Sequence, residues 1–358
     1  MPTTRAANAP PVPPGPGDEA ELDELLSRPR DDTVAALAAC HGDVVVLGAG
    51  GKMGPTLARL VARAAVEADA HAGRPTRRVI AVSRFSSSGA RHSLEDAGVE
   101  TISCDLLDRD AVGRLPDAPN VIFMAGQKFG TNEAPAMTWA MNTIVPATCA
   151  ERYADARIVA FSTGNVYPLS PVARRGARES DAVGPIGEYA ASCVGRERIF
   201  ELAADRSRTR VAIVRLNYAI DLRYGVLTDL AVKILHHEPI DLRMGYVNVI
   251  WQGDASRIAV ECLPRASAPP FVVNVTGRDV LSVRDLATRL GDRLGRAPVF
   301  SGDEAPDALL SDTGRMASVF SPAEVPLDWM LAWVAAWVRD GRPLLGRPTH
   351  FEERAGRF

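Results

Sequence analysis

The feature that most constrains the fold is an alternation of short apolar segments with amphipathic segments, which runs from Asp43 to about residue 217. Segments such as DVVVLGAG, RRVIAVSRF and ARIVAFST have the length and the β-branched content of strands, and helical spacing fills the stretches between them. Strands that are apolar on both faces indicate a parallel sheet covered by helices on each side. Beyond residue 217 the alternation is less regular. We therefore expect an α/β fold, a Rossmann-type doubly wound parallel sheet with a smaller C-terminal substrate lobe.

The first strand runs directly into the loop GAGGKMGP and then into a helix, with glycines three residues apart. In such a loop the first glycine permits a tight turn, the second lets the backbone approach a pyrophosphate, and the third lets the helix pack on the strand. The phosphates would lie on free N–H groups at the positive end of the helix. A dinucleotide site is therefore predicted, with a tight turn that binds no ligand as the alternative. The loop residues expected at the cofactor are Gly48, Gly51, Lys52, Met53 and Gly54.

The end of the second strand bears on the choice between NADP and NAD. An NAD enzyme usually places a carboxylate there for the ribose 2′-hydroxyl, whereas this strand ends in Ser83 and Arg84. Arg84 can pair with a 2′-phosphate, and Lys52 could add a second cation. The alternative for Arg84 is a solvated surface residue. We expect NADP as the cofactor, with NAD possible.

These patterns divide the chain into four parts. Residues 1–40 form a Pro-rich tail and a helical appendage, and residues 41–217 form the NAD(P)-binding Rossmann domain. Residues 218–345 form the C-terminal substrate lobe, which is interleaved with the last strands of the sheet. Residues 346–358 are a polar C-terminal tail, either disordered or folded over the cleft.

Charge and cysteine content exclude several classes of protein. The 41 Lys and Arg against 44 Asp and Glu give a net charge of −3, which argues against a nucleic-acid partner. No apolar run approaches the ~20 residues of a membrane-spanning helix, and the N-terminus lacks the apolar segment of a secretory signal. The 5 cysteines show no CxxC spacing and the histidines no HExxH pattern, so neither a disulfide framework nor a metal site is expected. We expect a cytoplasmic protein with a small-molecule substrate and no membrane partner.

These features, together with motifs further along the chain, resemble the extended short-chain dehydrogenase/reductase family, the NAD(P)-dependent epimerases and dehydratases. The resemblance covers about residues 43–340. Its cofactor motifs appear in order as the adenine-contacting pair Asp105 and Leu106, the HxAA-type segment Met124, Ala125 and Gly126, and the NVxGT asparagine Asn142. Its catalytic and substrate positions follow as Thr163 in FSTGNVY, Tyr189 of the YxxxK motif and Asn217 in RLNYA.

The resemblance implies a proton relay at the substrate oxygen. Hydride transfer at a carbinol carbon requires a proton to move on the attached oxygen, and Tyr189 would supply or accept it while Thr163 holds the oxygen. In the family, a lysine one helical turn after the tyrosine binds the nicotinamide ribose and favours the phenolate. Cys193 stands at that position in this chain. A thiol carries no positive charge, so the usual arrangement is broken.

Three interpretations of this departure remain open. Lys128, in the loop after the fourth strand, substitutes for the missing cation, or it is an ordinary exposed loop lysine. Alternatively, Tyr189 acts only as a proton donor, which favours reduction or a step that needs no phenolate. In the third interpretation catalysis is lost and the chain is a regulator or scaffold that binds NADP. Cys193 itself is expected to be a helix-packing residue rather than a nucleophile.

The substrate half of the site also departs from the family pattern. Relatives that act on nucleotide-sugars often carry an Arg that grips the diphosphate, and Val247 stands at that position here. A free sugar, a sugar acid or another small polar hydroxy or carbonyl compound therefore becomes as plausible as a nucleotide-sugar. The expected substrate residues are Thr163, Asn165, Asn217, Arg223, Tyr246 and Trp251.

The expected function is an NAD(P)-dependent oxidoreductase, epimerase or dehydratase acting on a sugar-like substrate through Tyr189, Thr163 and Lys128. The alternative is a catalytically impaired NADP-binding protein. The resemblance further implies a homodimer built from the helices that carry Asn142 and Tyr189.

Overall fold

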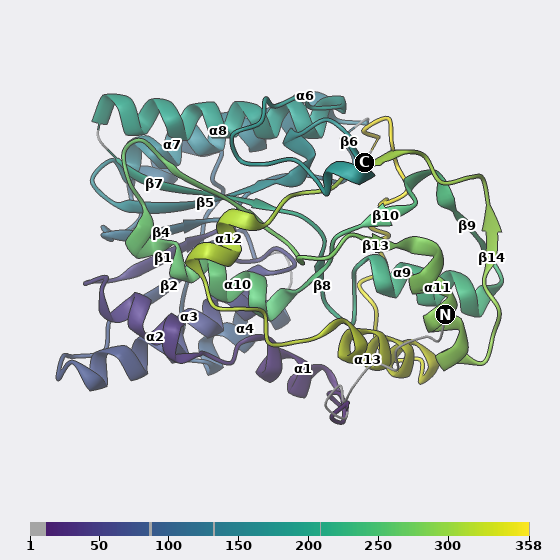
Figure 1. The fold of residues 1–358 in the computed structure, drawn as a ribbon. Helices are drawn as coiled ribbons and strands as arrows, with labels where there is room; N and C mark the ends of the chain where they lie inside the picture. Colours follow the sequence, from purple (N-terminus) through teal and green to yellow (C-terminus); the bar gives the residue numbers. More distant parts are fainter. Residues whose placement is uncertain (1–11, 86–87, 132, 208, 358) are drawn as a thin grey trace.

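The computed structural model describes residues 12–85, 88–131, 133–207 and 209–357 (Figure 1). The first eleven residues of the expected Pro-rich tail lie outside the described residues. At the centre is a seven-stranded sheet in the order β12-β7-β5-β4-β1-β2-β3, and every pair in it is parallel. Its strands are β1 (Val44–Leu47), β2 (Val79–Ser83), β3 (Glu100–Ser103), β4 (Asn120–Phe123), β5 (Arg157–Thr163), β7 (Arg210–Leu216) and β12 (Phe271–Val275). The predicted doubly wound Rossmann-type sheet is confirmed.

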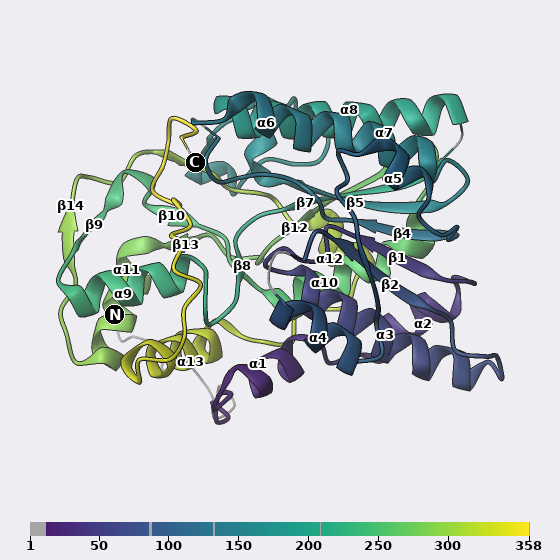
Figure 2. The same ribbon diagram turned by 180° about the vertical axis from the view of Figure 1, so that it is seen from behind.

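Helices cover both faces of this sheet, which explains why its central strands β1, β2 and β4 are buried and mostly apolar (Figures 1 and 2). In β1, Val44 and Val46 pack into one core layer, whereas Val45 and Leu47 pack into the other. The first layer is closed by α2 (Asp31–Ala38), α3 (Gly54–His71), α4 (Ser88–Asp96) and α10 (Gln252–Glu261). The second is closed by α5 (Arg109–Gly113), α7 (Val145–Arg152) and α8 (Gly187–Ser207). Beside α8 lie α6 (Pro135–Trp139) and the π-helical turn η1 (Ala140–Ile144).

A smaller lobe follows the sheet and has a hydrophobic core of its own. Its helices are α9 (Val226–His236), α11 (Val283–Leu294) and α13 (Leu327–Arg339), and α1 (Glu19–Leu26) adds Leu22 and Leu26 to the same core. The chain returns from this lobe to add β12 to the edge of the central sheet beside β7. The two parts are therefore interleaved in the chain.

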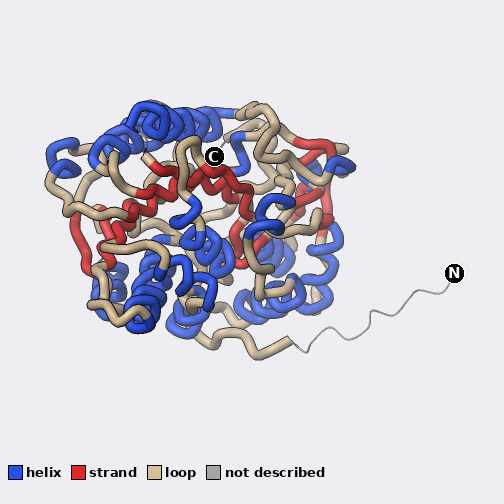
Figure 3. The backbone as a smooth tube through the Cα atoms, turned by 60° about the vertical axis from the view of Figure 1, so that its left-hand side comes forward, coloured by secondary structure: helices blue, strands red, loops and turns tan. Residues whose placement is uncertain are grey.

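Short elements complete the fold (Figure 3). The strands are β6 (Ser170–Pro171), β8 (Ala219–Ile220), β9 (Pro239–Asp241), β10 (Tyr246–Val247), β11 (Ile250–Trp251), β13 (Leu281–Ser282), β14 (Val299–Ser301) and β15 (Asp307–Ala308). The helical turns are η2 (Gly164–Val166), η3 (Val172–Arg174), η4 (Leu242–Met244), η5 (Leu263–Arg265) and α12 (Gly314–Val319). Within the described ranges, no helix has both the length and the apolar character needed to cross a bilayer.

After α13 the chain crosses back over the lobe as a strap, residues 342–357. Trp337 Nε1 donates to Pro343 O (2.9 Å) at its start, and Lys233 binds the Glu352 carboxylate (2.5 Å) in its middle. Near its end, the backbone of Gly356 packs directly on that of Gly187 at the first residue of α8. Of the two states that the sequence leaves open for the tail, the structure adopts the folded one.

Candidate functional site

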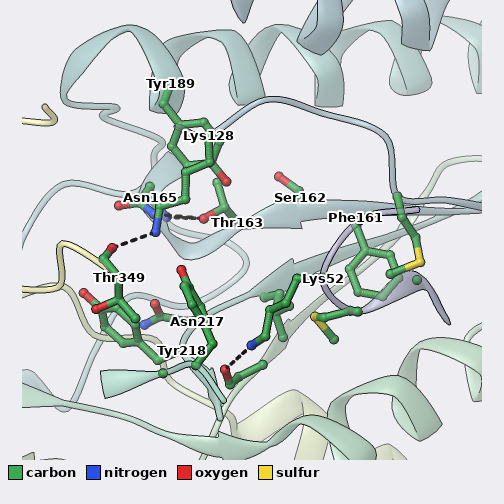
Figure 4. Close-up of a pocket in the computed structure, with 18 of the residues that line it drawn as sticks. Lys52, Lys128, Phe161, Ser162, Thr163, Asn165, Tyr189, Asn217, Tyr218 and Thr349 are labelled. Atoms are coloured by element: carbon green, nitrogen blue, oxygen red, sulfur yellow. Dashed lines mark hydrogen bonds between the residues drawn. The ribbon is translucent and has the colours of Figure 1, made fainter. Parts of the chain in front are cut away.

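A cavity of about 270 Å³ opens where β1, β4, β5 and β7 end, between the sheet and the smaller lobe (Figure 4). This is where ligands bind in open α/β sheets. The cavity brings together the glycine loop, the loop after β4, the end of β5, the start of α8 and the strap. Its lining residues are Gly48, Gly51, Lys52, Met53, Gly54, Met124, Lys128, Phe161, Ser162, Thr163, Asn165, Tyr189, Leu216, Asn217, Tyr218, Ala219, Tyr224, Gly225, Val226 and Thr349.

Glycine stands at the three loop positions for different structural reasons. Gly48 has φ +86°, and a Cβ there would lie 2.5 Å from Ala125 N. A Cβ on Gly54 would lie 2.3 Å from Ala49 O, so this glycine lets α3 pack on the loop. A Cβ on Gly51 would meet only Gly48 O, at 3.4 Å, and would otherwise project into open space. The protein's own packing therefore does not require glycine at Gly51, whereas a pyrophosphate approaching the backbone would, so the loop fits a dinucleotide.

The residues expected at the adenosine end lie at the ends of β2 and β3, away from the cavity lining. The Ser83 hydroxyl lies so close to the loop that a Cβ on Gly50 would be 2.4 Å from it. Arg84 is exposed, and its carbonyl accepts from Ser103 Oγ (3.4 Å). Leu106 is buried, while Asp105 Oδ1 accepts from the Leu107 amide (3.0 Å). Their contacts with a cofactor stay predictions.

The structure brings Tyr189 and Thr163 together, as predicted. Tyr189 lies in the first turn of α8, and Thr163 is the last residue of β5. The Tyr189 hydroxyl shares side-chain hydrogen bonds with Thr163 and Cys193. Thr163 Oγ1 also accepts from Asn165 N (3.2 Å) and Asn165 Nδ2 (3.0 Å), which fixes the hydroxyl. Burial, reinforced by Cys193, raises the pKa of Tyr189 well above its ordinary value, so at neutral pH it is a phenol.

Cys193 is fully buried beside Tyr189 and packs with Val166 and Ala177. Burial raises the pKa of its thiol, which supports the prediction that it packs the helix rather than reacts. A buried cation does lie on this helix, but one turn after Cys193, at Arg196. Its guanidinium favours the ionised forms of Tyr189 and Cys193, and so partly offsets the effect of burial on the pKa of each.

Arg196 ties three elements together behind the cavity. Its Nη1 donates to Phe161 O in β5 (2.8 Å), and its Nη2 donates to Asn142 Oδ1 in η1. A Cβ on Gly126 would lie 2.2 Å from Arg196 Nη2. Gly126 occupies an alanine position of the HxAA-type segment, so this departure is explained by the arginine. The motif comparison missed Arg196, although its helical spacing from Tyr189 and Cys193 was a usable signal.

Asn142 is buried and its amide is completely engaged. Nδ2 donates to Gln127 O (3.0 Å) and Ser192 Oγ (2.9 Å), while Oδ1 accepts from Gln127 N (3.0 Å) and from Arg196. These bonds hold the loop after β4 against α8. Asn142 thus shapes the cavity without lining it.

Two lysines reach the cavity from opposite sides (Figure 4). Lys128 Nζ donates to Thr349 O in the strap (3.1 Å), and Lys52 Nζ donates to Ala219 O (3.2 Å). Lys52 Nζ also lies 4.2 Å from the centre of the Tyr224 ring. Burial lowers the pKa of each ammonium to about 8. The expected pairing of Lys52 with Arg84 at a 2′-phosphate does not match this orientation, because the Lys52 side chain runs toward the smaller lobe.

The predicted substrate residues divide into two groups. Thr163, Asn165 and Asn217 line the cavity. The other three, Arg223, Tyr246 and Trp251, lie outside this lining, and their contacts with a substrate stay predictions. The sequence could not separate the groups, because all six follow strand ends or lie in the irregular lobe.

Each of these three residues makes contacts within the protein. The Arg223 guanidinium is held by Asp221 (2.9 Å) and by Asp23 of α1 (2.9 Å). Trp251 is 2 % exposed and packs edge-on against Trp333, with ring centres 5.7 Å apart. Tyr246 packs on the small cluster around Leu310.

The strap supplies a cavity residue that the sequence did not identify. Thr349 N and Oγ1 both donate to Asp229 Oδ2 of α9 (2.8 and 2.5 Å), while Thr349 O receives Lys128. Phe351 follows and is buried in the core of the lobe. The strap is therefore anchored on both sides of the point where it closes the cavity.

The smaller lobe supplies two further aromatic residues to the cavity lining. Tyr224 stacks beneath Lys52, and Tyr218 has φ +44°, a conformation that is an outlier for a bulky side chain. Strain of this kind persists where the surroundings determine the conformation, and it is common at binding sites. Tyr218 is one of the residues that line the cavity.

Comparisons with known proteins agree with this architecture. Three solved structures share the fold at low identity. One is a UDP-glucose 4-epimerase from Thermotoga maritima with UDP-glucose (17 % identity, 84 % of this chain and 99 % of that chain, TM-score 0.66). The others are a UDP-Glc/GlcNAc 4-epimerase from Campylobacter jejuni (17 %, 84 % and 100 %, 0.68) and DesIV, a dTDP-glucose 4,6-dehydratase from Streptomyces venezuelae with NAD bound (20 %, 83 % and 97 %, 0.68).

No curated protein matches the chain. The model of the family described as "NAD dependent epimerase/dehydratase family" matches residues 44–236, which is more than half of the chain and contains the glycine loop, Thr163 and Tyr189. The predicted resemblance is confirmed at the level of the family. This chain belongs to the NAD dependent epimerase/dehydratase family.

Proposed function

We propose that the chain is an NAD(P)-dependent oxidoreductase, epimerase or dehydratase that acts on a small polar hydroxy or carbonyl compound. The observation that supports this most is that Tyr189, Thr163 and the glycine loop line one cavity. The cofactor, when bound, would supply the hydride acceptor or donor. Gly48, Gly51 and Gly54 would hold its pyrophosphate.

Tyr189 would move the proton on the substrate oxygen, and Thr163 would hold that oxygen in place. Because burial raises the pKa of Tyr189, its neutral form is ready to donate a proton to an oxygen that gains negative charge during reduction. The reverse direction needs the phenolate, which a nearby cation would favour. Arg196, behind the cavity, lowers the pKa of Tyr189, and Lys128, which lines the same cavity, is proposed as a second cation for this role.

The strap and the arginines favour a compact substrate over a nucleotide-sugar. Thr349 limits the cavity on its outer side, and Val247 is buried where the family's diphosphate-binding arginine is expected. Arg223 and Arg243, the two possible replacements, are each paired with a carboxylate, Asp221 and Asp241 respectively.

NADP is proposed as the preferred cofactor, because β2 ends in the exposed Arg84 without a carboxylate. Fluorescence titration with NADPH and NADH tests this. Tighter binding of NADPH that is lost in Arg84→Ser supports the proposal, whereas a preference for NADH contradicts it.

We also propose a homodimer through the layer of α6, η1 and α8. This layer leaves large apolar side chains exposed to 37–56 %, which is unusual for a free surface. They are Met137, Trp139, Ile144, Ile186 and Leu202. Light scattering on Ile144→Glu tests the proposal, since an unchanged mass relative to the parent protein would contradict it.

Tyr189→Phe tests the catalytic assignment. Turnover should be abolished while cofactor affinity stays nearly unchanged, and Tyr246→Phe is the matched control because Tyr246 lies outside the cavity. Full turnover in Tyr189→Phe would contradict the role of Tyr189.

A non-catalytic NADP-binding protein is the second candidate, favoured by the uncharged Cys193 at the lysine position. It predicts cofactor binding by the parent protein with no turnover across a substrate panel.

A further inference from the structure

We propose that Asn165 is a positioning residue that commits the Thr163 hydroxyl to donate its proton, so that the site binds a ketone or an aldehyde through its carbonyl oxygen. The proposal rests on the function proposed above and narrows the substrate class of the same cavity. It also gives Asn165, which the sequence places among the substrate residues, a role that acts through Thr163.

A tight turn brings Asn165 back onto Thr163 at the end of β5. Thr163 caps the helical turn η2, and its Oγ1 accepts from Asn165 N at 3.2 Å. Gly164, between them, lies against Asn217, where a Cβ would be 3.0 Å from Asn217 Cγ. Glycine therefore lets the turn pass Asn217 closely. The side chain of Asn165 then adds a second bond, which Nδ2 donates to Thr163 Oγ1 at 3.0 Å (Figure 4).

The two bonds from Asn165 fill the acceptor capacity of the Thr163 hydroxyl. A hydroxyl group has one proton to donate and two lone pairs that accept. The backbone N–H and the side-chain NH2 of Asn165, which both reach Thr163 Oγ1, can only donate. The side-chain hydrogen bond between Thr163 and Tyr189 is therefore one that Thr163 donates. The pKa of Tyr189 agrees with this direction, because the bond from Thr163 lowers it, as a bond donated to the phenolate does.

This direction suits a substrate oxygen that gains negative charge. A carbonyl oxygen can only accept hydrogen bonds, and hydride addition to its carbon moves the C=O π electrons onto the oxygen. The Tyr189 proton then completes the new hydroxyl. Thr163 is buried at the cavity wall and has a proton to give to such an oxygen. A carbonyl oxygen between Thr163 and Tyr189 would meet two donors that are in place before the charge develops.

Calorimetry on the full-length protein saturated with its oxidised cofactor tests the proposal, because a ketone cannot be reduced under that condition. The probes are dihydroxyacetone against 2-methylidenepropane-1,3-diol and tetrahydropyran-4-one against 4-methylidenetetrahydropyran. In each pair a CH2 group replaces the carbonyl oxygen at nearly the same shape, so the ratio of affinities reports the hydrogen bonds to that oxygen. At least one ketone should bind the parent protein about tenfold or more tightly than its partner, as expected of two neutral hydrogen bonds.

Variants of Asn165 and Thr163 identify which group sets this ratio. Asn165→Asp replaces a donor by an acceptor, so Thr163 should turn its proton to the new carboxylate and the ratio should fall to about threefold or less. Thr163→Val should lower the ratio in the same way. Thr163→Ser, which keeps the hydroxyl, and Thr288→Val, at an exposed residue of α11, should keep the ratio. In a Thr163→Val background, Asn165→Asp should change the ratio by less than about twofold, because Asn165 acts through Thr163.

Three results would overturn the proposal. The first is that the parent protein binds neither ketone more tightly than its methylidene partner, or binds neither ketone at all. The second is an unchanged ratio in Asn165→Asp, which would mean that Thr163 donates to the amide oxygen of Asn165 instead. The third is an equal effect of Asn165→Asp in the parent and in Thr163→Val, which would assign the effect to the added charge. The first result needs no variant, so a folding defect cannot hide it.

Failure of the proposed function gives a different result. If Tyr189→Phe keeps full turnover while the ketone preference and its dependence on Asn165 stand, the catalytic assignment fails and the role of Asn165 survives. If Tyr189→Phe abolishes turnover and the ketone preference is absent, the reverse holds.

Discussion

Replacing Gly126 by alanine should disturb the buried arginine behind the site. The new Cβ would lie 2.2 Å from Arg196 Nη2 and 2.9 Å from Asn142 Oδ1, both closer than real contacts allow. Arg196 cannot retreat freely, because its Nη1 also donates to Phe161 O (2.8 Å). Losing a hydrogen bond from a charged donor in a buried site costs about 1.5–3 kcal/mol. We therefore expect Gly126→Ala to lower the free energy of unfolding by about 2–3 kcal/mol.

A double-mutant cycle separates this cause from a general effect of the loop. In an Arg196→Met background the closer of the two clash partners is gone and only Asn142 Oδ1, at 2.9 Å, remains, so Gly126→Ala should cost clearly less, about 1 kcal/mol. The measurement is urea unfolding of the four proteins at one pH, followed by circular dichroism. An equal cost of Gly126→Ala in both backgrounds would refute the reasoning.

Three further predictions concern the cavity and the strap. Lys52→Met should raise the free energy of unfolding of the ligand-free protein at pH 7 by roughly 1–3 kcal/mol, because burial lowers the pKa of Lys52 to about 8. Between about pH 8 and 10.5 the folded parent protein binds fewer protons than the unfolded chain, so its own stability rises with pH. The stability gained by Lys52→Met should therefore shrink as pH rises through that window. A gain that is independent of pH in urea titrations would contradict this prediction. Cys193→Lys places a second cation beside Arg196 at a fully buried position, so it should lower the free energy of unfolding by about 2–4 kcal/mol in the same urea titration. An unchanged free energy of unfolding would show that the new lysine reaches the cavity instead. Asp229→Asn weakens the anchor of Thr349, so hydrogen exchange of the Phe351 amide should become faster, and an unchanged rate would show that the other strap contacts suffice.

The sheet could be predicted because its information is local. Most of the strands are short apolar runs, and the glycine loop combines a turn, a close approach and a helix start in seven residues that leave little freedom. The proximity of Thr163 and Tyr189 could be predicted for a related reason, since Thr163 ends a strand and Tyr189 lies in the first turn of a helix beside it.

The other parts of the site could not be predicted from the sequence, because they depend on contacts between segments that are distant in the chain. Arg223 and Trp251 looked suitable for a substrate, but α1 supplies Asp23 to the first and α13 supplies Trp333 to the second. Neither contact has a local signature. Arg196 was missed because the motif comparison stopped at Cys193, and Thr349 because nothing in a polar tail shows where it will pack.

The strap also has a consequence for the order in which the fold is completed. Thr349, which lines the cavity, and Gly356, which packs on the start of α8, follow the sheet and the smaller lobe in the sequence. Because a chain is synthesised from its N-terminus, the central strands can form before the strap exists, and the cavity gains its Thr349 wall only after the sheet has assembled.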